Sequence, residues 1–368
     1  MTELIQTADA LDQFCEDMSR SPWVGVDTEF ERIRTYHPRL CLIQISTPHQ
    51  TVCIDPLAGL DLTPVARLLG CDGPLKIIHS ARQDIEVINH EIGVVPSPLF
   101  DTQIAAAFCG FGEQVGYAAL VEAICDIKLA KGYTRTAWCK RPLSTNQIAY
   151  ALDDAKFLGI LYEYLKRNLQ DSQRLSWAQE EFDTLAGTDL LDASRSAAIE
   201  KISNAARGLT QVGQSIATAL AKWREQAAMH CDQPRQWLLS NDQLLTIAAA
   251  APFSVIELAQ IDNVASEFCK RWGETVITVV ECGRDEAVQF PVRGRPRKLL
   301  PGQKALDKLL WKELQKISDA ADLPPSLIAR RDDIRALAAG KRDLLLLRGW
   351  RSEIAGKSLL HCITRYIN

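Results

Sequence analysis

Short apolar runs separated by turn residues dominate the beginning of the chain. Residues 75–79 illustrate the pattern, in which an apolar run is bounded by Pro, Gly and polar residues, as is typical of strands. From Ala81 onward the apolar spacing becomes helical. Strands followed by helices predict an α/β domain with helices packed on one sheet. The predicted strands are 23–30, 40–46, 51–55 and 75–79, and the predicted helices that follow them are 81–92, 101–109 and 115–127.

The second half of the chain has the pattern of helices. A long helix is predicted at about 145–168, because Ser144 and Gln147 fit a capping box at its start. Beyond about residue 170 strand patterns nearly vanish, and the apolar run 276–280 is interpreted as the buried part of a helix. Two helical blocks are expected, at roughly 205–283 and 299–368. The Gly, Pro and cations of 294–298 indicate an exposed linker between them.

Length and composition narrow the class of protein. A chain of 368 residues suits two or three domains, and 47% hydrophobic with 24% charged residues is typical of a soluble globular protein. No segment has the roughly 18 uncharged apolar residues of a membrane span, and the N-terminus lacks a secretion signal. We therefore expect a cytoplasmic protein without a membrane partner. The 11 cysteines show no C-x-x-C pair, so we interpret them as reduced, with neither a zinc knuckle nor a disulfide framework.

Charge is unevenly distributed along the chain. The net charge is −4, but residues 283–368 carry 18 Lys and Arg against 10 Asp and Glu, which leaves 24 against 36 in the rest. A basic end on an acidic body is what a phosphate-binding module joined to a carboxylate-rich metal site would have.

Two carboxylates interrupt the first strong strand pattern. Asp27 and Glu29 are two residues apart, so they share one face of the strand, opposite Val26 and Phe30. Acids are disfavoured inside strands, and a compensating positive charge is one explanation for the pair. A solvent-facing edge strand is the other.

Two further acids fall near element ends. Asp84 follows the fourth strand and lies in the first turn of a helix, where an acid also simply complements the helix dipole. Tyr150 and Asp154 are four residues apart in the long helix, and therefore neighbours on its surface. A partly buried carboxylate on that stripe needs a partner such as a cation. His79 is interpreted as a packed or hydrogen-bonded histidine rather than a metal ligand.

The order D-x-E, an Asp after a strand, then Y-x-x-x-D on a helix resembles the DEDD superfamily of 3′→5′ exonucleases, in its Tyr-type subgroup. Further segments resemble the ribonuclease D family and, after about residue 205, the paired HRDC domains of its bacterial members. The nuclease segments are 30–36, 42–45, 101–103 and 141–144, and the HRDC segments are 223–224, 252–254, 257–258, 272–273 and 349–351.

The resemblance implies a fold and a domain plan. The fold would be an α/β nuclease domain with a ribonuclease H-like mixed sheet and flanking helices, followed by two small all-α HRDC-like domains. We place the exonuclease domain at 1–204, the first HRDC-like domain at 205–290 and the second at 295–368.

The resemblance also implies a reaction and roles for the acids. The chain would be a 3′→5′ exoribonuclease that releases nucleoside 5′-monophosphates, with tRNA precursors and other structured small RNAs as expected substrates. Asp27 would bridge two divalent cations, Glu29 and Asp154 would bind the first, and Asp84 would support the second through water. Tyr150 would orient the attacking water, because a phenol with a pKa near 10 is a poor base at neutral pH. Hard oxygen ligands favour Mg²⁺ or Mn²⁺ over zinc.

The 3′ end of a substrate needs cations and stacking faces. Candidates near the motifs are Arg32, Arg34, Tyr36, Trp138 and Arg141, together with Arg135 and Lys140. The alternative for each Arg is a solvated surface residue, and for Trp138 it is a core aromatic. The same four acids would also serve a 3′→5′ DNA exonuclease, and a catalytically silent nucleic-acid-binding adaptor with a basic tail is the non-enzymatic alternative. A monomer is expected, because no large exposed apolar patch is identifiable.

Overall fold

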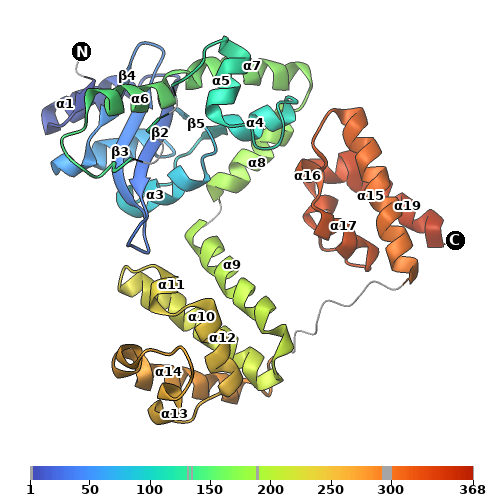
Figure 1. Ribbon diagram of the computed structural model, residues 1–368. Helices are drawn as coiled ribbons and strands as arrows, with labels where there is room; N and C mark the ends of the chain where they lie inside the picture. Colours follow the sequence, from blue (N-terminus) through green and yellow to red (C-terminus); the bar gives the residue numbers. More distant parts are fainter. Residues whose placement is uncertain (1–2, 131, 134–135, 188–189, 292–300, 368) are drawn as a thin grey trace. The chain divides into compact units, whose positions relative to one another are not determined.

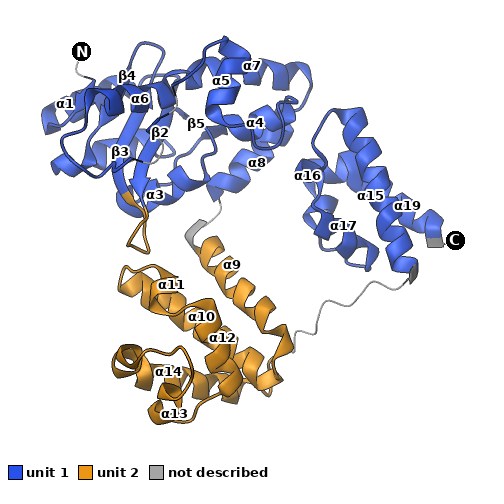
Figure 2. Ribbon diagram, viewed as in Figure 1, with its two compact units in different colours: residues 1–31, 40–188, 298–368 blue, residues 32–39, 189–297 orange. Residues whose placement is uncertain are grey.

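The structure is a computed structural model that describes residues 3–130, 132–133, 136–187, 190–291 and 301–367. The chain forms two compact units, residues 1–31, 40–188 and 298–368 in one and residues 32–39 and 189–297 in the other (Figure 2). The predicted linker 294–298 and Arg135 lie outside the described residues. No helix in the described ranges is long and apolar enough to span a membrane. The predicted domain boundaries stay a prediction.

One mixed sheet of six strands forms the centre of the first unit (Figure 1). Its order is β1-β4-β3-β2-β5-β6, with β3 and β4 antiparallel and the β1/β4, β2/β5 and β5/β6 pairs parallel. The four predicted strands are confirmed within two residues at each end. The two-residue β1 and three-residue β6 carry no periodic signal and were not predicted. The strands are β1 Leu4–Ile5, β2 Trp23–Glu31, β3 Arg39–Ser46, β4 Thr51–Ile54, β5 Leu75–Ile78 and β6 Leu99–Asp101.

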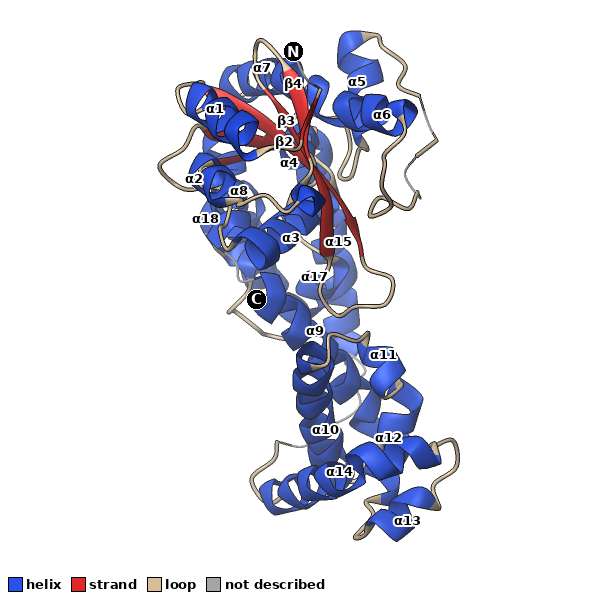
Figure 3. Ribbon diagram, turned by 90° about the vertical axis from the view of Figure 1, so that its left-hand side faces the viewer, coloured by secondary structure: helices blue, strands red, loops and turns tan. Residues whose placement is uncertain are grey.

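Helices follow and flank the sheet, and the described strands all lie before residue 102 of the chain (Figure 3). The expected α/β class is therefore confirmed. The helices of this part are α1 Ala8–Met18, α2 Thr63–Leu69, α3 Arg82–Ile92, α4 Thr102–Phe108, α5 Tyr117–Cys125, α6 Thr145–Lys156, α7 Leu158–Asp171 and α8 Leu175–Gly187.

The predicted long helix is two helices, and the prediction of one continuous helix was wrong. Ser144 and Gln147 form the expected capping box at the start of α6, but α6 ends at Lys156. The Tyr117 hydroxyl donates to the Asp153 carbonyl at 3.0 Å and accepts the Phe157 N–H at 3.2 Å. That phenol replaces the helical bond between residues 153 and 157, and a side chain inserted into the hydrogen-bond ladder breaks a helix.

The break lets α7 pack closely against β2. A Cβ on Gly159 would lie 2.2 Å from the Trp23 ring, and a Cβ on Gly25 would lie 3.0 Å from the Leu158 Cβ. The two glycines therefore permit a backbone approach that larger residues would prevent. This approach fixes the C-terminal end of α6 against β2.

The C-terminal helices of the first unit share a hydrophobic core with α4, α7 and α8. Trp350 is 1% exposed, its ring centroid lies 5.1 Å from that of Phe108, and its Nε1 donates to Glu181 at 2.8 Å. Arg351 donates to the same carboxylate at 2.5 Å. The helices are α15 Pro301–Ala321, α16 Pro325–Ile328, α17 Arg331–Ala338, α18 Gly349–Arg351 and α19 Lys357–Ile367.

The second unit is helical in its described residues 190–291, as predicted. The run 276–280 lies inside α14, which confirms its interpretation as part of a helix. The unit has its own core around α10, α12 and α14. Its helices are α9 Leu190–Ala205, α10 Gln211–His230, α11 Arg235–Leu238, α12 Asn241–Ala250, α13 Val255–Ala259 and α14 Ser266–Glu286.

One disulfide contradicts the prediction that the cysteines are reduced. Cys41 of β3 and Cys139, which precedes α6, are bonded to each other. The two residues are 98 apart in sequence, so their proximity depends on the fold and no local spacing reveals it.

Candidate active site

Three predicted carboxylates converge where β2 meets α6. Carboxylate oxygens of Asp27, Glu29 and Asp154 all lie within 4.8 Å of one another. The strand period places Asp27 and Glu29 on one face of β2, and Val24 and Val26 on the other face are fully buried. The packing of α7 on β2 places Asp154 beside the pair.

Asp84 lies next to this group, in the first turn of α3 as predicted. The residue is 7% exposed, and its carboxylate accepts a hydrogen bond from the Thr28 hydroxyl at 2.5 Å. Its charge acts on Asp27 and Glu29. Sequence reasoning missed Thr28, although its position between the two acids of D-x-E was a usable signal.

The turn that carries Asp84 is held by Asp101. The Asp101 carboxylate accepts the N–H groups of Ser80 at 3.2 Å and Ala81 at 2.8 Å, as well as those of Gln103 and Ile104 at the start of α4. This carboxylate therefore has a structural role, fixing the turn between β5 and α3.

His79 is hydrogen-bonded, as the sequence analysis expected. Its Nε2 lies 3.0 Å from the Val115 carbonyl and its Nδ1 lies 2.9 Å from the Thr102 hydroxyl. Since a carbonyl only accepts, Nε2 donates. Burial lowers the pKa of His79, which favours the neutral ring.

The clustered acids resist ionisation. Burial, followed by repulsion from Asp84, Asp154 and Glu29, raises the pKa of Asp27 well above its ordinary value. Burial and the same kind of repulsion raise the pKa of Glu29 to about 9. Burial raises the pKa of Asp84 to about 7 and that of Asp154 to about 6. Several negative charges at this spacing are stable near neutral pH only with a compensating cation.

The donor set fits divalent cations of the hard type. Carboxylate oxygens are the ligands that Mg²⁺ and Mn²⁺ prefer, and these three share a space in which one ion can contact them all. Tyr150 lies on the same helix, one turn before Asp154, and its hydrogen bond to Asp154 opposes the rise of that group's pKa. The phenol is thereby held beside the carboxylates.

Tyr117 is a second tyrosine that sequence reasoning missed. It is the first residue of α5, and its hydroxyl contacts the end of α6. Burial raises its pKa, with Asp154 and Asp27 adding to the effect. The neutral phenol joins the Asp153 carbonyl to the Phe157 N–H, which fixes where α6 ends. Its contacts with residues 153 and 157 span 36 and 40 residues, so no local pattern reveals them.

The two predicted substrate-binding residues of the first unit, Trp138 and Arg141, have protein partners of their own. Trp138 is 2% exposed in a small cluster that includes Cys41 and Ala151. Arg141 forms an ion pair with Asp55 at 2.6 Å and donates to the Cys41 carbonyl.

Arg32, Arg34 and Tyr36 belong to the second unit. Tyr36 donates to Glu225 at 3.0 Å, and the Arg235 guanidinium lies over its ring. Arg32 and Arg34 are exposed on the segment before β3.

Comparisons with known proteins agree with this architecture. The model of the 3′-5′ exonuclease family matches residues 2–170, and that of the HRDC domain matches residues 214–280. Ribonuclease D of Acidiphilium cryptum is 36% identical over 97% of this chain and 92% of its own length. Ribonuclease D of Jannaschia sp. is 36% identical over 99% of this chain and 95% of its own length.

A solved structure is similar over the whole chain. Escherichia coli RNase D, described as an exoribonuclease involved in structured RNA processing, superposes with a TM-score of 0.85 at 29% identity and covers 100% of this chain and 99% of its own. Members of this exonuclease family generally depend on divalent metal ions. The chain therefore belongs to the ribonuclease D family of 3′→5′ exoribonucleases.

Proposed function

We propose that this chain removes nucleotides one at a time from the 3′ end of RNA by hydrolysis, releasing nucleoside 5′-monophosphates. The observation that carries the proposal is the convergence of Asp27, Glu29 and Asp154 within 4.8 Å, with their pKa values raised by burial and mutual repulsion. Such a group binds divalent cations, and divalent cations are what phosphodiester hydrolysis needs.

The roles of the acids follow from their positions. We propose that Asp27, Glu29 and Asp154 hold two divalent cations, Mg²⁺ or Mn²⁺, and that Asp84 supports the second through water. When bound, the cations would neutralise the phosphate oxygens, lower the pKa of the attacking water and stabilise the leaving oxygen. Thr28 keeps the Asp84 carboxylate oriented through its hydroxyl.

Tyr150 is proposed to orient the attacking water. Its hydroxyl donates to Asp154, so a lone pair on the same oxygen stays available to accept from a water molecule. A phenol in this arrangement positions the water without having to deprotonate it.

The substrate is proposed to be RNA with a structured body, and tRNA precursors fit that description. Its support is the role of the Escherichia coli relative in structured RNA processing. Arg32 and Arg34 remain proposed contacts for the RNA backbone, whereas we propose structural roles for Tyr36, Trp138 and Arg141 because of the packing and ion pairs described above. The second HRDC-like domain, the cytoplasmic location and the monomeric state stay predictions.

Cleavage of matched substrates tests the proposal. A tRNA precursor with a 3′ extension, an unstructured RNA of equal length and the DNA equivalent are each incubated with the protein, with and without EDTA. Stepwise shortening of the RNAs, lost with EDTA and restored by Mg²⁺, supports an exoribonuclease. Preferential shortening of the DNA supports a DNA exonuclease, and binding without cleavage supports an adaptor.

The basic C-terminal helices offer a further contact for RNA phosphates. Lys312, Lys316 and Arg365 line a surface pocket of about 510 Å³ between α15 and α19. Deleting this domain is an unsuitable test, because it would expose the core that Trp350 shares with Phe108. Replacing the three cations by Gln should instead weaken RNA binding and reduce the slope of log K against log salt by about 2. An unchanged slope would show that these cations do not contact the RNA.

A further inference from the structure

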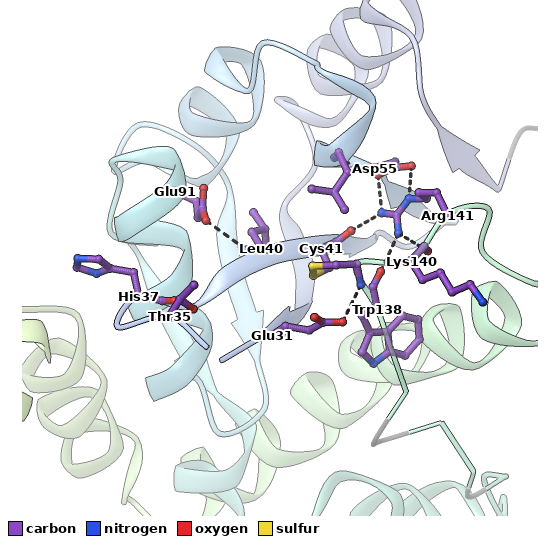
Figure 4. The surroundings of a disulfide bond; sticks show 12 residues. Glu31, Thr35, His37, Leu40, Cys41, Asp55, Glu91, Trp138, Lys140 and Arg141 are labelled. Atoms are coloured by element: carbon purple, nitrogen blue, oxygen red, sulfur yellow. Dashed lines mark hydrogen bonds and ion pairs between the residues drawn. A yellow bond between two sulfur atoms is a disulfide. The ribbon is translucent and has the colours of Figure 1, made fainter. Parts of the chain in front are cut away.

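Figure 4 shows the surroundings of the Cys41–Cys139 disulfide. The bond joins two parts of the first unit that lie next to elements of the candidate active site. Cys41 is fully buried in β3, the strand next to the β2 strand of Asp27 and Glu29. Cys139 belongs to the segment that leads into α6, the helix of Tyr150 and Asp154. The bond therefore connects the sheet to the chain just before this helix.

Noncovalent contacts hold the same segment to the sheet. The Cys139 N–H donates to Glu31 at 2.9 Å, and Glu31 lies two residues beyond Glu29 at the end of β2. Arg141 pairs with Asp55 and donates to the Cys41 carbonyl at 2.6 Å, as Figure 4 shows. The segment is thus fastened on both sides of Cys139.

This segment packs against Tyr150. The Trp138 ring is buried next to the disulfide, and its centroid lies 6.2 Å from that of the Tyr150 ring at an interplanar angle of 33°. Cys41, Trp138 and Ala151 form one small hydrophobic cluster, and Tyr150 and Cys139 pack on it. A shift of the Cys139 segment therefore changes the packing that holds the Tyr150 ring.

We infer that Cys41 and Cys139 are a site of reversible thiol–disulfide exchange that sets the position of Tyr150 and thereby the rate of hydrolysis. The bonded state is the one in which the carboxylates converge and Tyr150 contacts Asp154. The inference rests on the proposed role of Tyr150, and Cys139 is a positioning residue, because it acts through Trp138 and the phenol.

The chemistry needs an external thiol or disulfide of low molecular weight. In reduction, an external thiolate attacks the sulfur of the half-buried Cys139, the Cys41 sulfur leaves as a thiolate and takes up a proton, and a mixed disulfide forms at Cys139. A second external thiolate then attacks the sulfur that the first external thiol contributed to the mixed disulfide, and this releases the Cys139 thiolate. Two electrons pass from two external thiols, which become one disulfide, to the two cysteine sulfurs. Reoxidation reverses each step.

Peptide mapping and melting test the bond without any nuclease assay. Full-length protein incubated with oxidised glutathione should yield a linked peptide pair containing residues 41 and 139, and dithiothreitol should abolish it. Because a cross-link over a long loop restricts the unfolded chain, reduction should lower the melting temperature by about 5–10 °C. A protein that forms no such linked pair after oxidation would overturn the inference.

Kinetics test the coupling to the site. Reduction should lower the kcat for a 3′-tailed RNA about tenfold with little change in KM, because a displaced positioning group slows the chemical step more than binding. Cys139→Ser should have the low kcat in both redox conditions. Cys71→Ser/Cys282→Ser, which removes two exposed free cysteines, is the matched control and should respond to reduction as the wild type does. A wild-type kcat that ignores reduction contradicts the coupling.

Tyr150→Phe distinguishes positioning from general loosening. If the disulfide acts through the phenol, reduction should leave the single-turnover rate of Tyr150→Phe unchanged, while its melting temperature still falls. A tenfold loss of rate on reduction in this variant would refute the route through Tyr150. An absence of RNA cleavage in either redox state, with the linked peptide and the melting shift intact, would instead count against the proposed function.

Discussion

Two buried acidic regions of the first unit differ in what balances their charge. Burial opposes ionisation of Asp55, but hydrogen bonds from Arg141 and Gln6 outweigh it and hold the pKa of Asp55 below its ordinary value. Burial also opposes ionisation of Asp27, and there the neighbouring carboxylates increase the effect and raise its pKa. Protein groups balance the negative charge of Asp55, whereas the carboxylates around Asp27 need a cation that the protein itself does not supply.

This difference separates structural from functional acids. Removing a carboxylate that protein groups satisfy leaves a buried cation or donors without a partner, which costs stability. Removing a carboxylate that is surrounded by other carboxylates relieves repulsion but removes a ligand. Stability and activity should therefore respond in opposite ways to isosteric amide substitutions in the two regions.

Asp27→Asn should have the largest effect. It removes the charge at the centre of the cluster, so kcat on a 3′-tailed RNA should fall at least about 10³-fold while RNA still binds. The EDTA-treated variant should melt at a higher temperature than the EDTA-treated wild type, because repulsion is relieved. Binding is measured by fluorescence anisotropy, and retention of full activity would remove the two-cation assignment.

The pH dependence of melting should be the next largest effect. The carboxyl groups have pKa values near 4 when unfolded, and in the fold Asp154, Asp84 and Glu29 have values of about 6, 7 and 9. Since the folded state favours the protonated forms, their contribution to stability is complete below pH 4 and is lost as the pH rises toward 9.

Scanning fluorimetry with EDTA from pH 5 to pH 9 should show this loss in the metal-free protein. Mg²⁺ at about 100 times its Kd should raise the melting temperature by roughly 5–10 °C, and by more at pH 8 than at pH 5.5. Asp27→Asn should reduce both the pH dependence and the gain with Mg²⁺. An equal gain at the two pH values would show that these acids are not the ligands.

Asp55→Asn is the matched substitution in the region where Arg141 and Gln6 balance the charge of the acid. It leaves Arg141 without its ionic partner, and because the Arg141 side chain is 24% exposed, water offsets part of the cost. The free energy of unfolding should fall by about 1–3 kcal/mol, with kcat within about tenfold of the wild type. Denaturant unfolding measures this free energy. A variant with unchanged stability and a kcat as low as that of Asp27→Asn would contradict the distinction between the two regions.

Asp55, whose charge protein groups balance, and the clustered acids around Asp27 look alike in sequence, so the sequence alone does not distinguish a structural acid from a metal ligand. Strands such as β2 were predictable, because β-branched and apolar residues alternate between turn signals there. Asp27, Glu29 and Asp154 could be selected because their elements had clear patterns. The two-residue β1 carries no period, and the partners of Asp55 come from segments far along the chain.

Long-range contacts explain the parts that sequence reasoning did not find. The Cys41–Cys139 bond spans 98 residues, and the contact of Thr28 with Asp84 spans 56. Trp138 was a candidate either for stacking on RNA or for the core, because it is aromatic and lies near a motif, and only the fold shows that its ring is buried. Side chains that complete a site from another element become visible only when the fold brings them together.

Tyr117→Phe should have the smallest effect of the four, and it tests whether the end of α6 depends on one phenol. The substitution keeps the ring but leaves the Asp153 carbonyl and the Phe157 N–H without their shared partner. The free energy of unfolding should fall by about 1–2 kcal/mol. Because Asp154 lies between those two residues, kcat should fall a few-fold as its carboxylate shifts, roughly 2- to 5-fold. Tyr162→Phe, which removes a phenol that accepts from Lys166, serves as the control and should leave kcat unchanged. If Tyr117→Phe matched that control in both stability and kcat, residues 153 and 157 would be bonding to each other directly, and the helix break would have to arise from the packing of Gly159 against Trp23 alone.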